Sequence, residues 1–196
     1  MMSALHPDIV SNRAVLMVTL TLLAMRVLIA AWLPLFGDEA FYWQESRVLA
    51  VSYTDLPPLT AWLIALGTAL GGDTLLGVRW PFLLIGAALP LVLRHWAIWR
   101  LGNSADANRV ALYAMFLPLI NMGGVLALPD LPLTLLMLQA FVCLDRAADS
   151  NRARDWALLG LCLGAALLTH WRAAALCTTG LAWVILSARG RRCLRS

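Results

Sequence analysis

A run of twenty mostly apolar residues, Ala14 to Leu33, is the feature that most constrains what this chain can fold into. At about 1.5 Å per residue, a helix of this length crosses the roughly 30 Å of hydrocarbon in a bilayer. Arg13 precedes the run and two alanines lie near its end, as in a signal peptide, but the run exceeds the roughly 7 to 15 residues of a signal-peptide core. We therefore expect an uncleaved first membrane helix over residues 14–33.

The rest of the chain is also strongly apolar. Of its 196 residues, 61% are hydrophobic and 13% are charged, against about 25% charged in a typical soluble domain. Charges, glycines and prolines divide it into further apolar segments, and the spans expected from them lie at about 14–33, 81–99, 110–126, 131–145, 156–170 and 173–188. The sequence thus predicts an all-α fold, one polytopic transmembrane helix bundle of about six spans that covers residues 1–196.

The segment 59–70 is apolar but only about a dozen residues long, which fits an interfacial or re-entrant helix better than a span. The arginines decide between these alternatives. If 59–70 stays outside the membrane, eleven of the fifteen arginines face the cytoplasm, as the positive-inside rule requires. We therefore expect a multi-pass protein of the cell (inner) membrane with both termini cytoplasmic. Residues 34–80 then form a long outer loop that contains short interfacial helices.

This topology gathers the candidate acidic groups on the non-cytoplasmic face. Asp38 and Glu39 directly follow the first span. They are either solvated acids at the interface or a site in which one partly buried carboxylate acts as a general base, since consecutive residues of a helix point in different directions. Asp55 precedes a double proline, and Asp130 lies between two prolines. Each either marks the start of a helix or joins Asp38 around a hydroxyl group or a divalent cation.

Three arginines and one histidine are the candidate cationic groups. Arg26 is a charge well inside the first span, so it should face a protein cavity or extend to the interface. Arg79 and Arg172 lie on the outer side, where they contact lipid headgroups or bind a phosphate through their planar donors. His170, beside Arg172, is either an interfacial histidine or a substrate ligand. The cysteines form no CxxC pair and no basic stripe carries aromatic residues, so neither a zinc site nor nucleic-acid binding is expected.

Five motifs follow one another along the chain: "DEAFYW" after the first span, "DLPPLTAWLIALGTALGGD", "GVRWP" at the second span, "LPDLPL" after the third and "LLTHW" at the end of the fifth. In this order and on these sides of the membrane they resemble the membrane glycosyltransferases of the GT-C superfamily. The nearest group is the protein O-mannosyltransferase-like family that includes the bacterial aminoarabinose lipid A transferases. The resemblance covers nearly the whole chain.

The resemblance implies a donor sugar carried on a polyprenyl phosphate and transferred, with inversion, to a hydroxyl of a protein, lipid or glycan outside the cytoplasm. Asp38 matches the first-loop acid that activates the acceptor, and Glu39 completes that motif in a supporting role. Asp55 matches the carboxylate before the double proline, and Asp130 the acid of the second outer loop. Asp38 and Asp55 are also candidate ligands of a divalent metal, although two loop acids define no coordination shell.

The chain also departs from the family pattern. Leu56 stands where a basic residue or histidine is usual, and His170 where lysine is frequent. Family members are commonly much longer, so we expect the acceptor-binding part to lie in a C-terminal portion or a partner chain, and this chain to be inactive alone. The alternatives are a non-catalytic transporter subunit or lipid-binding scaffold, and an inactive remnant. Transporters usually keep polar groups near the bilayer midplane, whereas the acids here lie in outer loops.

Overall fold

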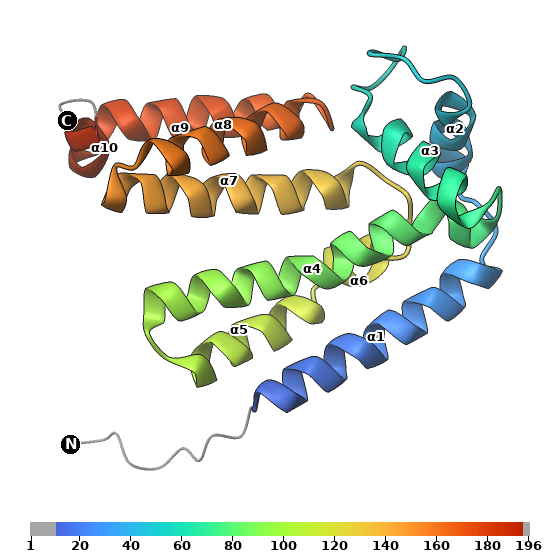
Figure 1. The fold of residues 1–196 in the computed structure, drawn as a ribbon, viewed down its shortest axis with the longest axis horizontal. Coiled ribbons are helices and arrows are strands. Elements are labelled where there is room, and N and C mark those ends of the chain that lie inside the picture. Colours follow the sequence, from blue (N-terminus) through green and yellow to red (C-terminus); the bar gives the residue numbers. More distant parts are fainter. Residues whose placement is uncertain (1–10, 194–196) are drawn as a thin grey trace.

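The computed structural model describes residues 11–193, and within this range the protein consists of α-helices and connecting segments without a strand (Figure 1). The helices are α1 (Asn12–Trp32), α2 (Gly37–Ser46), α3 (Leu59–Gly71), α4 (Leu75–Leu101), α5 (Ser104–Met115), α6 (Pro118–Gly123), α7 (Asp130–Ser150), α8 (Ala153–Leu167), α9 (Ala173–Leu186) and α10 (Ala188–Cys193). The all-α fold class expected from the sequence is confirmed.

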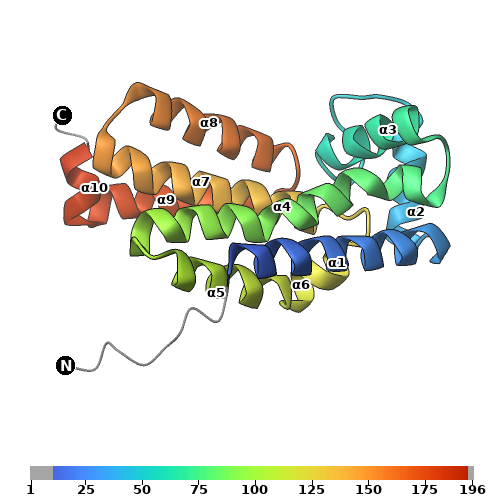
Figure 2. The ribbon, with the colours of Figure 1, turned by 60° about the horizontal axis from the view of Figure 1, so that its bottom comes forward.

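The longer helices run back and forth along one direction, so the molecule has two distinct ends (Figures 1 and 2). Helices α2 and α3 form one end, which we call the α2–α3 end. The α4–α5 turn, the α7–α8 turn and α10 form the other, which we call the arginine end. The main packing pairs are α7 with α8, α4 with α5, α3 with α4 and α1 with α4. Segments far apart in the sequence therefore meet at each end.

Much of the lateral surface is apolar. Among the described residues, α1, α4 and α7 are long and apolar enough to cross a membrane by length and composition, and α3 and α9 are shorter apolar helices. Leu28 of α1, Leu161 of α8 and Leu186 of α9 are 66%, 69% and 75% exposed. Leucines exposed in this way are stable against lipid tails, and helices satisfy their own backbone groups there. The chain is a multi-pass membrane protein.

Close backbone packing holds the short helix α3 against the start of α4. A Cβ atom on Gly67 would lie 2.3 Å from the carbonyl oxygen of Gly77 and 3.1 Å from the ring of Pro81, so only glycine permits this approach. The indole Nε1 of Trp80 donates a hydrogen bond of 3.0 Å to the carbonyl of Gly67. As a result, α3 packs on α2 and α4 at the α2–α3 end.

The segment expected as one span over 110–126 forms two helices. Helix α5 ends at Met115 and α6 begins at Pro118, with Leu117 extended at ψ 133°. Proline has no N–H and disfavours helical geometry in the residue before it, so the break falls at this position. The side-chain amide of Asn121 donates to the carbonyl of Met115 at 2.6 Å. This hydrogen bond satisfies a carbonyl that the break would otherwise leave unpaired inside the bundle.

An ion-pair network joins three helices at the arginine end. Arg100 of α4 and Arg189 of α10 both pair with Asp145 and Asp149 of α7. Two of these contacts, Arg189 to Asp145 and Arg100 to Asp149, measure 3.1 and 3.3 Å. Networks of several charges stabilise more than isolated surface pairs do. This one fixes the ends of α4, α7 and α10 relative to one another.

Candidate functional site

A fully buried ion pair between Glu39 and Arg79 lies at the α2–α3 end. Both side chains have 0% exposure. The Nε of Arg79 donates to Glu39 Oε1 at 2.8 Å and its Nη2 donates to Oε2 at 2.6 Å. Two parallel bonds between guanidinium and carboxylate fix both the distance and the relative orientation of the two groups. The pair therefore fastens the first turn of α2 to the first turns of α4.

The remaining donors of Arg79 hold the end of α1. Its Nη1 donates to the carbonyls of Ala30 and Leu33 at 3.0 and 2.5 Å, and its Nη2 donates to the carbonyl of Pro34 at 3.0 Å. Carbonyls at the C-terminal end of a helix lack intrahelical partners and carry partial negative charge, so a buried cation suits them. The sequence suggested an outer cation near lipid headgroups or phosphate. Arg79 instead lies in the interior with its donors engaged by protein.

The carboxylate of Glu39, like the guanidinium of Arg79, forms several hydrogen bonds within the protein. In addition to Arg79, it accepts hydrogen bonds from the backbone N–H groups of Ala127 at 2.8 Å and Phe36 at 3.0 Å. Burial alone would raise the pKa of Glu39, but the bonds from Arg79, Ala127 and Phe36 outweigh burial and lower this pKa below its ordinary value. Glu39 therefore stays charged and joins α2 both to α4 and to the segment before α7.

The lowered pKa of Glu39 predicts that the fold loses stability in acid. Its contribution is complete above the ordinary value of 4.5 and disappears as the pH falls through the lower pKa of the folded state. We expect the melting temperature to change little between about pH 7 and 5 and to fall below about pH 4.5. Thermal unfolding at stepped pH measures this, with Glu39→Gln as the control whose acid-dependent loss should be smaller. A melting temperature that rises on acidification would contradict the assignment.

Asp38 has the opposite environment from its neighbour. It is exposed, while Glu39 points into the interior, as expected for consecutive residues of a helix. Both lie in the first turn of α2, where the helix dipole favours negative charge. Within residues 11–193 no side-chain hydrogen bond engages Asp38. The buried Glu39–Arg79 pair thus fixes the turn that presents a free carboxylate at the surface.

Four carboxylates act electrostatically on Tyr42 at the α2–α3 end. The pKa of Tyr42 is raised first by burial and then by the negative charges of Asp38, Glu45, Asp130 and Asp55. Asp55 also acts on Glu45, whose pKa is raised by burial and by that charge. The structure thus brings together Asp38, Asp55 and Asp130, the three outer-loop acids singled out in the sequence. We call these three acids with Glu45 and Tyr42 the acid cluster.

Tyr42 and Glu45 were missed as site residues by the sequence analysis. Their positions follow Asp38 at i+4 and i+7, which places all three on one face of α2. This spacing was the sequence signal that could have identified Tyr42 and Glu45 as site residues.

The turn between α8 and α9 completes this end. The Nη2 of Arg172 donates to Asp130 Oδ1 at 2.8 Å, and its Nε lies 3.3 Å from His170 Nε2. Burial and then the charge of Arg172 lower the pKa of His170, against the opposing effect of Asp130. The backbone N–H of Leu59 donates to the carbonyl of Leu168 at 2.8 Å. His170 and Arg172 therefore lie next to the acid cluster.

Arg26 lies apart from these groups. It is 5% exposed, its Nη2 donates to Asn121 Oδ1 at 3.0 Å, and its buried Nε has no hydrogen-bond partner. A Cβ atom on Gly124 would lie 3.0 Å from Nη1 of Arg26, and a Cβ atom on Gly86 would lie 3.2 Å from it. The two glycines therefore leave room for the guanidinium group of Arg26. Arg26 also lines an apolar groove of about 330 Å³ between α1 and α6. It faces protein in the bundle rather than the acid cluster.

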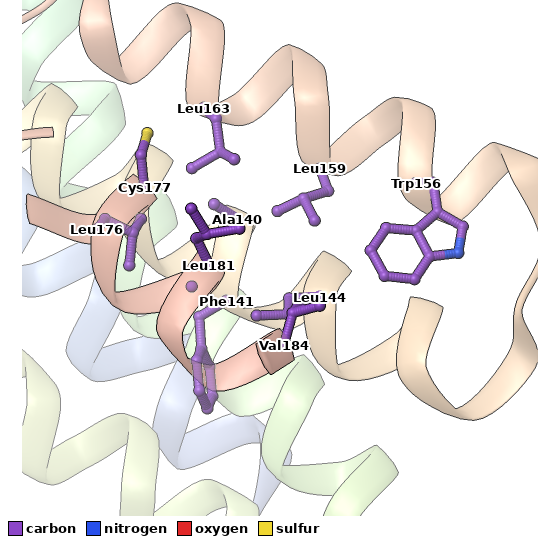
Figure 3. A pocket seen from close by; sticks show the side chains of 11 residues that line it. Ala140, Phe141, Leu144, Trp156, Leu159, Leu163, Leu176, Cys177, Leu181 and Val184 are labelled. Carbon is purple, nitrogen blue, oxygen red and sulfur yellow. The ribbon is translucent and has the colours of Figure 1, made fainter. Parts of the chain in front are cut away.

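Another apolar pocket, of about 230 Å³, lies between α7, α8 and α9 (Figure 3). Leu144, Leu159, Leu163 and Leu181 line it, and Phe141 contributes to its wall. Its wall carries no acid, histidine or arginine, and none of its lining residues belongs to the acid cluster. The chemistry-bearing groups therefore lie in the acid cluster, not in this pocket.

The side chains that could coordinate a metal ion do not form a metal site among the described residues. Among the described residues no group of three or more histidines, cysteines, aspartates or glutamates is placed to hold a metal ion. Divalent cations such as Ca²⁺ take six or more oxygen ligands, and Mg²⁺ requires near-octahedral geometry. Asp38 and Asp55 thus remain an incomplete ligand set.

Known proteins show similarity over most of the chain. The family described as dolichyl-phosphate-mannose-protein mannosyltransferase matches residues 55–196. The undecaprenyl phosphate-alpha-4-amino-4-deoxy-L-arabinose arabinosyl transferase 1 of Pseudomonas fluorescens (strain Pf0-1) is 30% identical over 136 residues, which are 65% of this chain and 23% of that protein. The corresponding transferase of Pseudomonas aeruginosa (strain LESB58) is 33% identical over 133 residues, 65% of this chain and 24% of that protein.

A second transferase of Pseudomonas fluorescens (strain Pf0-1), numbered 2, is 29% identical over 155 residues, 70% of this chain and 28% of that protein. The chain thus spans about a quarter of the length of the curated relatives it matches. No solved structure matches it. Because the family match extends over residues 55–196, well over half of the sequence, the chain belongs to the dolichyl-phosphate-mannose-protein mannosyltransferase family.

Proposed function

We propose that this chain contributes the general base and the phosphate-binding cation of a glycosyltransferase site, in which a sugar moves from a polyprenyl phosphate to a hydroxyl of a protein, lipid or glycan. The names of the relatives support the lipid-linked donor. The observation that carries the proposal is the exposed carboxylate of Asp38, presented beside Asp55 and Asp130 by the buried Glu39–Arg79 pair. The acceptor-binding part is placed outside residues 1–196, because the chain spans only about a quarter of the length of its curated relatives.

Asp38 acts as the general base in this proposal. The acceptor hydroxyl gives its proton to the Asp38 carboxylate while its oxygen attacks the anomeric carbon of the sugar. The bond from that carbon to the phosphate oxygen breaks, and the electron pair leaves on polyprenyl phosphate. Arg172, exposed beside Asp130, is the cation that stabilises the phosphate as its charge develops. Glu39 and Arg79 are positioning residues.

The direct test supplies a polyprenyl-phosphate sugar to membranes in which this chain is present together with the part that binds the acceptor. We expect free polyprenyl phosphate and a glycosylated acceptor to appear together. Movement of the intact lipid across the membrane, without cleavage, would reject the transferase and support a transporter subunit instead.

The orientation that we propose places the α2–α3 end outside the cytoplasm and the arginine end inside, with about six crossings as the arginine pattern predicts. Single-cysteine variants test it. Leu70 of α3 is 71% exposed, and Ser104 is exposed at the start of α5. In a background without the native cysteines, a membrane-impermeant thiol reagent should label Leu70→Cys in intact cells and Ser104→Cys only after the membrane is opened. Labelling of Ser104→Cys from outside would contradict the orientation.

Arg172→Gln should weaken donor use. Loss of one charge-assisted contact to phosphate is expected to raise KM for the donor roughly tenfold while changing kcat less. Arg47→Gln is the matched control, because Arg47 is an equally exposed arginine at the same end and also pairs with an exposed aspartate, Asp73. Initial rates at varied donor concentration measure both variants. Equal changes in KM for the two variants would remove Arg172 from the phosphate site.

A further inference from the structure

A polar pocket of about 450 Å³ opens at the arginine end, beside the turn from α7 to α8. Three arginines line it: Arg146 from α7, and Arg152 and Arg154 from the start of α8. Trp99 at the end of α4 and Leu158 of α8 contribute its apolar walls. The pocket lies at the end of the molecule opposite the acid cluster.

One carboxylate in this pocket, Asp149, is already neutralised from outside it. Asp149 pairs with Arg100 and Arg189, which also pair with Asp145. These two cations and two anions balance one another. The ion-pair network therefore leaves the arginines of the pocket uncompensated.

The other carboxylate, Asp155, is held by a hydroxyl group: it accepts a hydrogen bond of 2.5 Å from Ser150. Within residues 11–193, none of the three pocket arginines forms an ion pair with a carboxylate. Arg146 lies 2.8 Å from His95 Nε2 and 5.6 Å from the centre of the Trp99 ring. Three arginines thus face a single carboxylate, and the pocket has an excess of positive charge.

The backbone adds to this charge. Helix α8 runs for 15 residues from Ala153, and its N-cap residue Arg152 forms no side-chain capping hydrogen bond. The first N–H groups of a helix carry partial positive charge and lack intrahelical partners. The pocket therefore combines guanidinium groups with the N-terminal end of a long helix.

An apolar helix face leads away from the pocket. Arg154, Leu158 and Leu161 follow one another at i, i+4 and i+7, so they share one face of α8. Leu158 is 37% exposed and Leu161 is 69% exposed. A ligand that uses both features needs an anionic group at Arg154 and an apolar chain that lies along the leucines.

We propose that this pocket binds the phosphate group of an anionic glycerophospholipid, with an acyl chain of that lipid along the α8 face. The excess positive charge selects an anionic headgroup, and the leucines distinguish a lipid from free phosphate. Basic pockets of this kind between membrane helices recognise anionic headgroups. The site is separate from the acid cluster, so it binds a structural lipid rather than the sugar donor.

Retention of lipid by the purified chain tests this proposal. The chain is extracted into detergent, incubated with phosphatidylglycerol or phosphatidylcholine, and analysed by native mass spectrometry. We expect phosphatidylglycerol to be retained in preference to phosphatidylcholine, and the Arg152→Gln/Arg154→Gln variant to weaken that retention by about tenfold or more, since each basic residue contributes severalfold. The matched control is Arg13→Gln/Arg192→Gln, two exposed arginines outside the pocket. This control should retain the lipid as the unchanged chain does.

Three results would overturn the proposal. Equal retention of the two lipids would show no headgroup selection, and equal losses in the two double variants would show general surface charge only. Displacement of phosphatidylglycerol by inorganic phosphate at comparable concentration would show an anion site that makes no use of the leucines. Leu161→Gln provides a second variant with the arginines intact, and it should also weaken lipid retention. Unchanged retention by this variant would reject the acyl-chain part of the site.

Discussion

Replacing Arg79 by methionine is expected to lower the free energy of unfolding by about 3–5 kcal/mol, the usual cost of breaking a buried ion pair from one side. The substitution leaves the Glu39 carboxylate charged at 0% exposure and removes the donors from the carbonyls at the end of α1. The first loss falls on a carboxylate that is fully buried, and the second includes the carbonyl of Ala30, a residue with 0% exposure. The thermal unfolding temperature in detergent, with the fraction of folded protein after extraction, measures the effect.

Two variants make this expectation specific. Arg47→Met removes an arginine whose side chain is 56% exposed, and it should change stability by no more than about 0.5 kcal/mol. Combining Arg79→Met with Glu39→Leu removes both charges and should recover part of the loss, because apolar replacements of buried pairs are often tolerated. If Arg79→Met is as stable as Arg47→Met, the buried pair is not what holds α2 against α4.

Replacing Asp38 by asparagine is expected to lower kcat for sugar transfer by at least about 100-fold, the lower range for loss of a general base. Asparagine keeps the shape of the side chain but cannot accept a proton. Because Asp38 is exposed and has no side-chain hydrogen bond among the described residues, the fold should be unaffected. Initial rates at saturating donor measure the change, and the melting temperature confirms that the variant is folded.

Asp73→Asn is the matched control for this variant. Asp73 is also an exposed acid at the α2–α3 end, but it bonds to Trp43 and Arg47 and is not among the four acids with the largest effect on the pKa of Tyr42. It should keep kcat within about twofold of the unchanged protein, as expected for a surface substitution outside the site. Similar losses in the two variants would mean that general surface charge, rather than one base, matters at this end.

The sequence predicted the helical class, which is confirmed, and it predicted that Asp38, Asp55 and Asp130 share one face, because both expectations follow from coarse patterns. Apolar runs predicted the helices, and the arginine distribution predicted one face for Asp38, Asp55 and Asp130. The electrostatic effect of all three acids on Tyr42 agrees with this grouping. Such patterns depend on composition and order alone, so they need no knowledge of packing.

The environments of the charged side chains could not be predicted in this way. Arg79 in "GVRWP" looked like an interfacial cation, but its burial depends on where the end of α1 and the first turn of α2 meet α4. These contacts join residues about forty positions apart, which no local pattern encodes. The break at Pro118 could have been predicted from the sequence, because a proline inside an apolar run is a strong helix-breaking signal.

The release of polyprenyl phosphate from a polyprenyl-phosphate sugar tests the central claim most directly, because it measures cleavage of the donor at the acid cluster. Membranes in which the acceptor-binding part is present together with this chain, either unchanged or as Asp38→Asn or Asp73→Asn, are compared at equal protein amounts. The unchanged protein and Asp73→Asn should release polyprenyl phosphate in step with glycosylated acceptor, whereas Asp38→Asn should release about 100-fold less. Release by folded Asp38→Asn at the rate of the unchanged protein would contradict the assignment of Asp38 as the base.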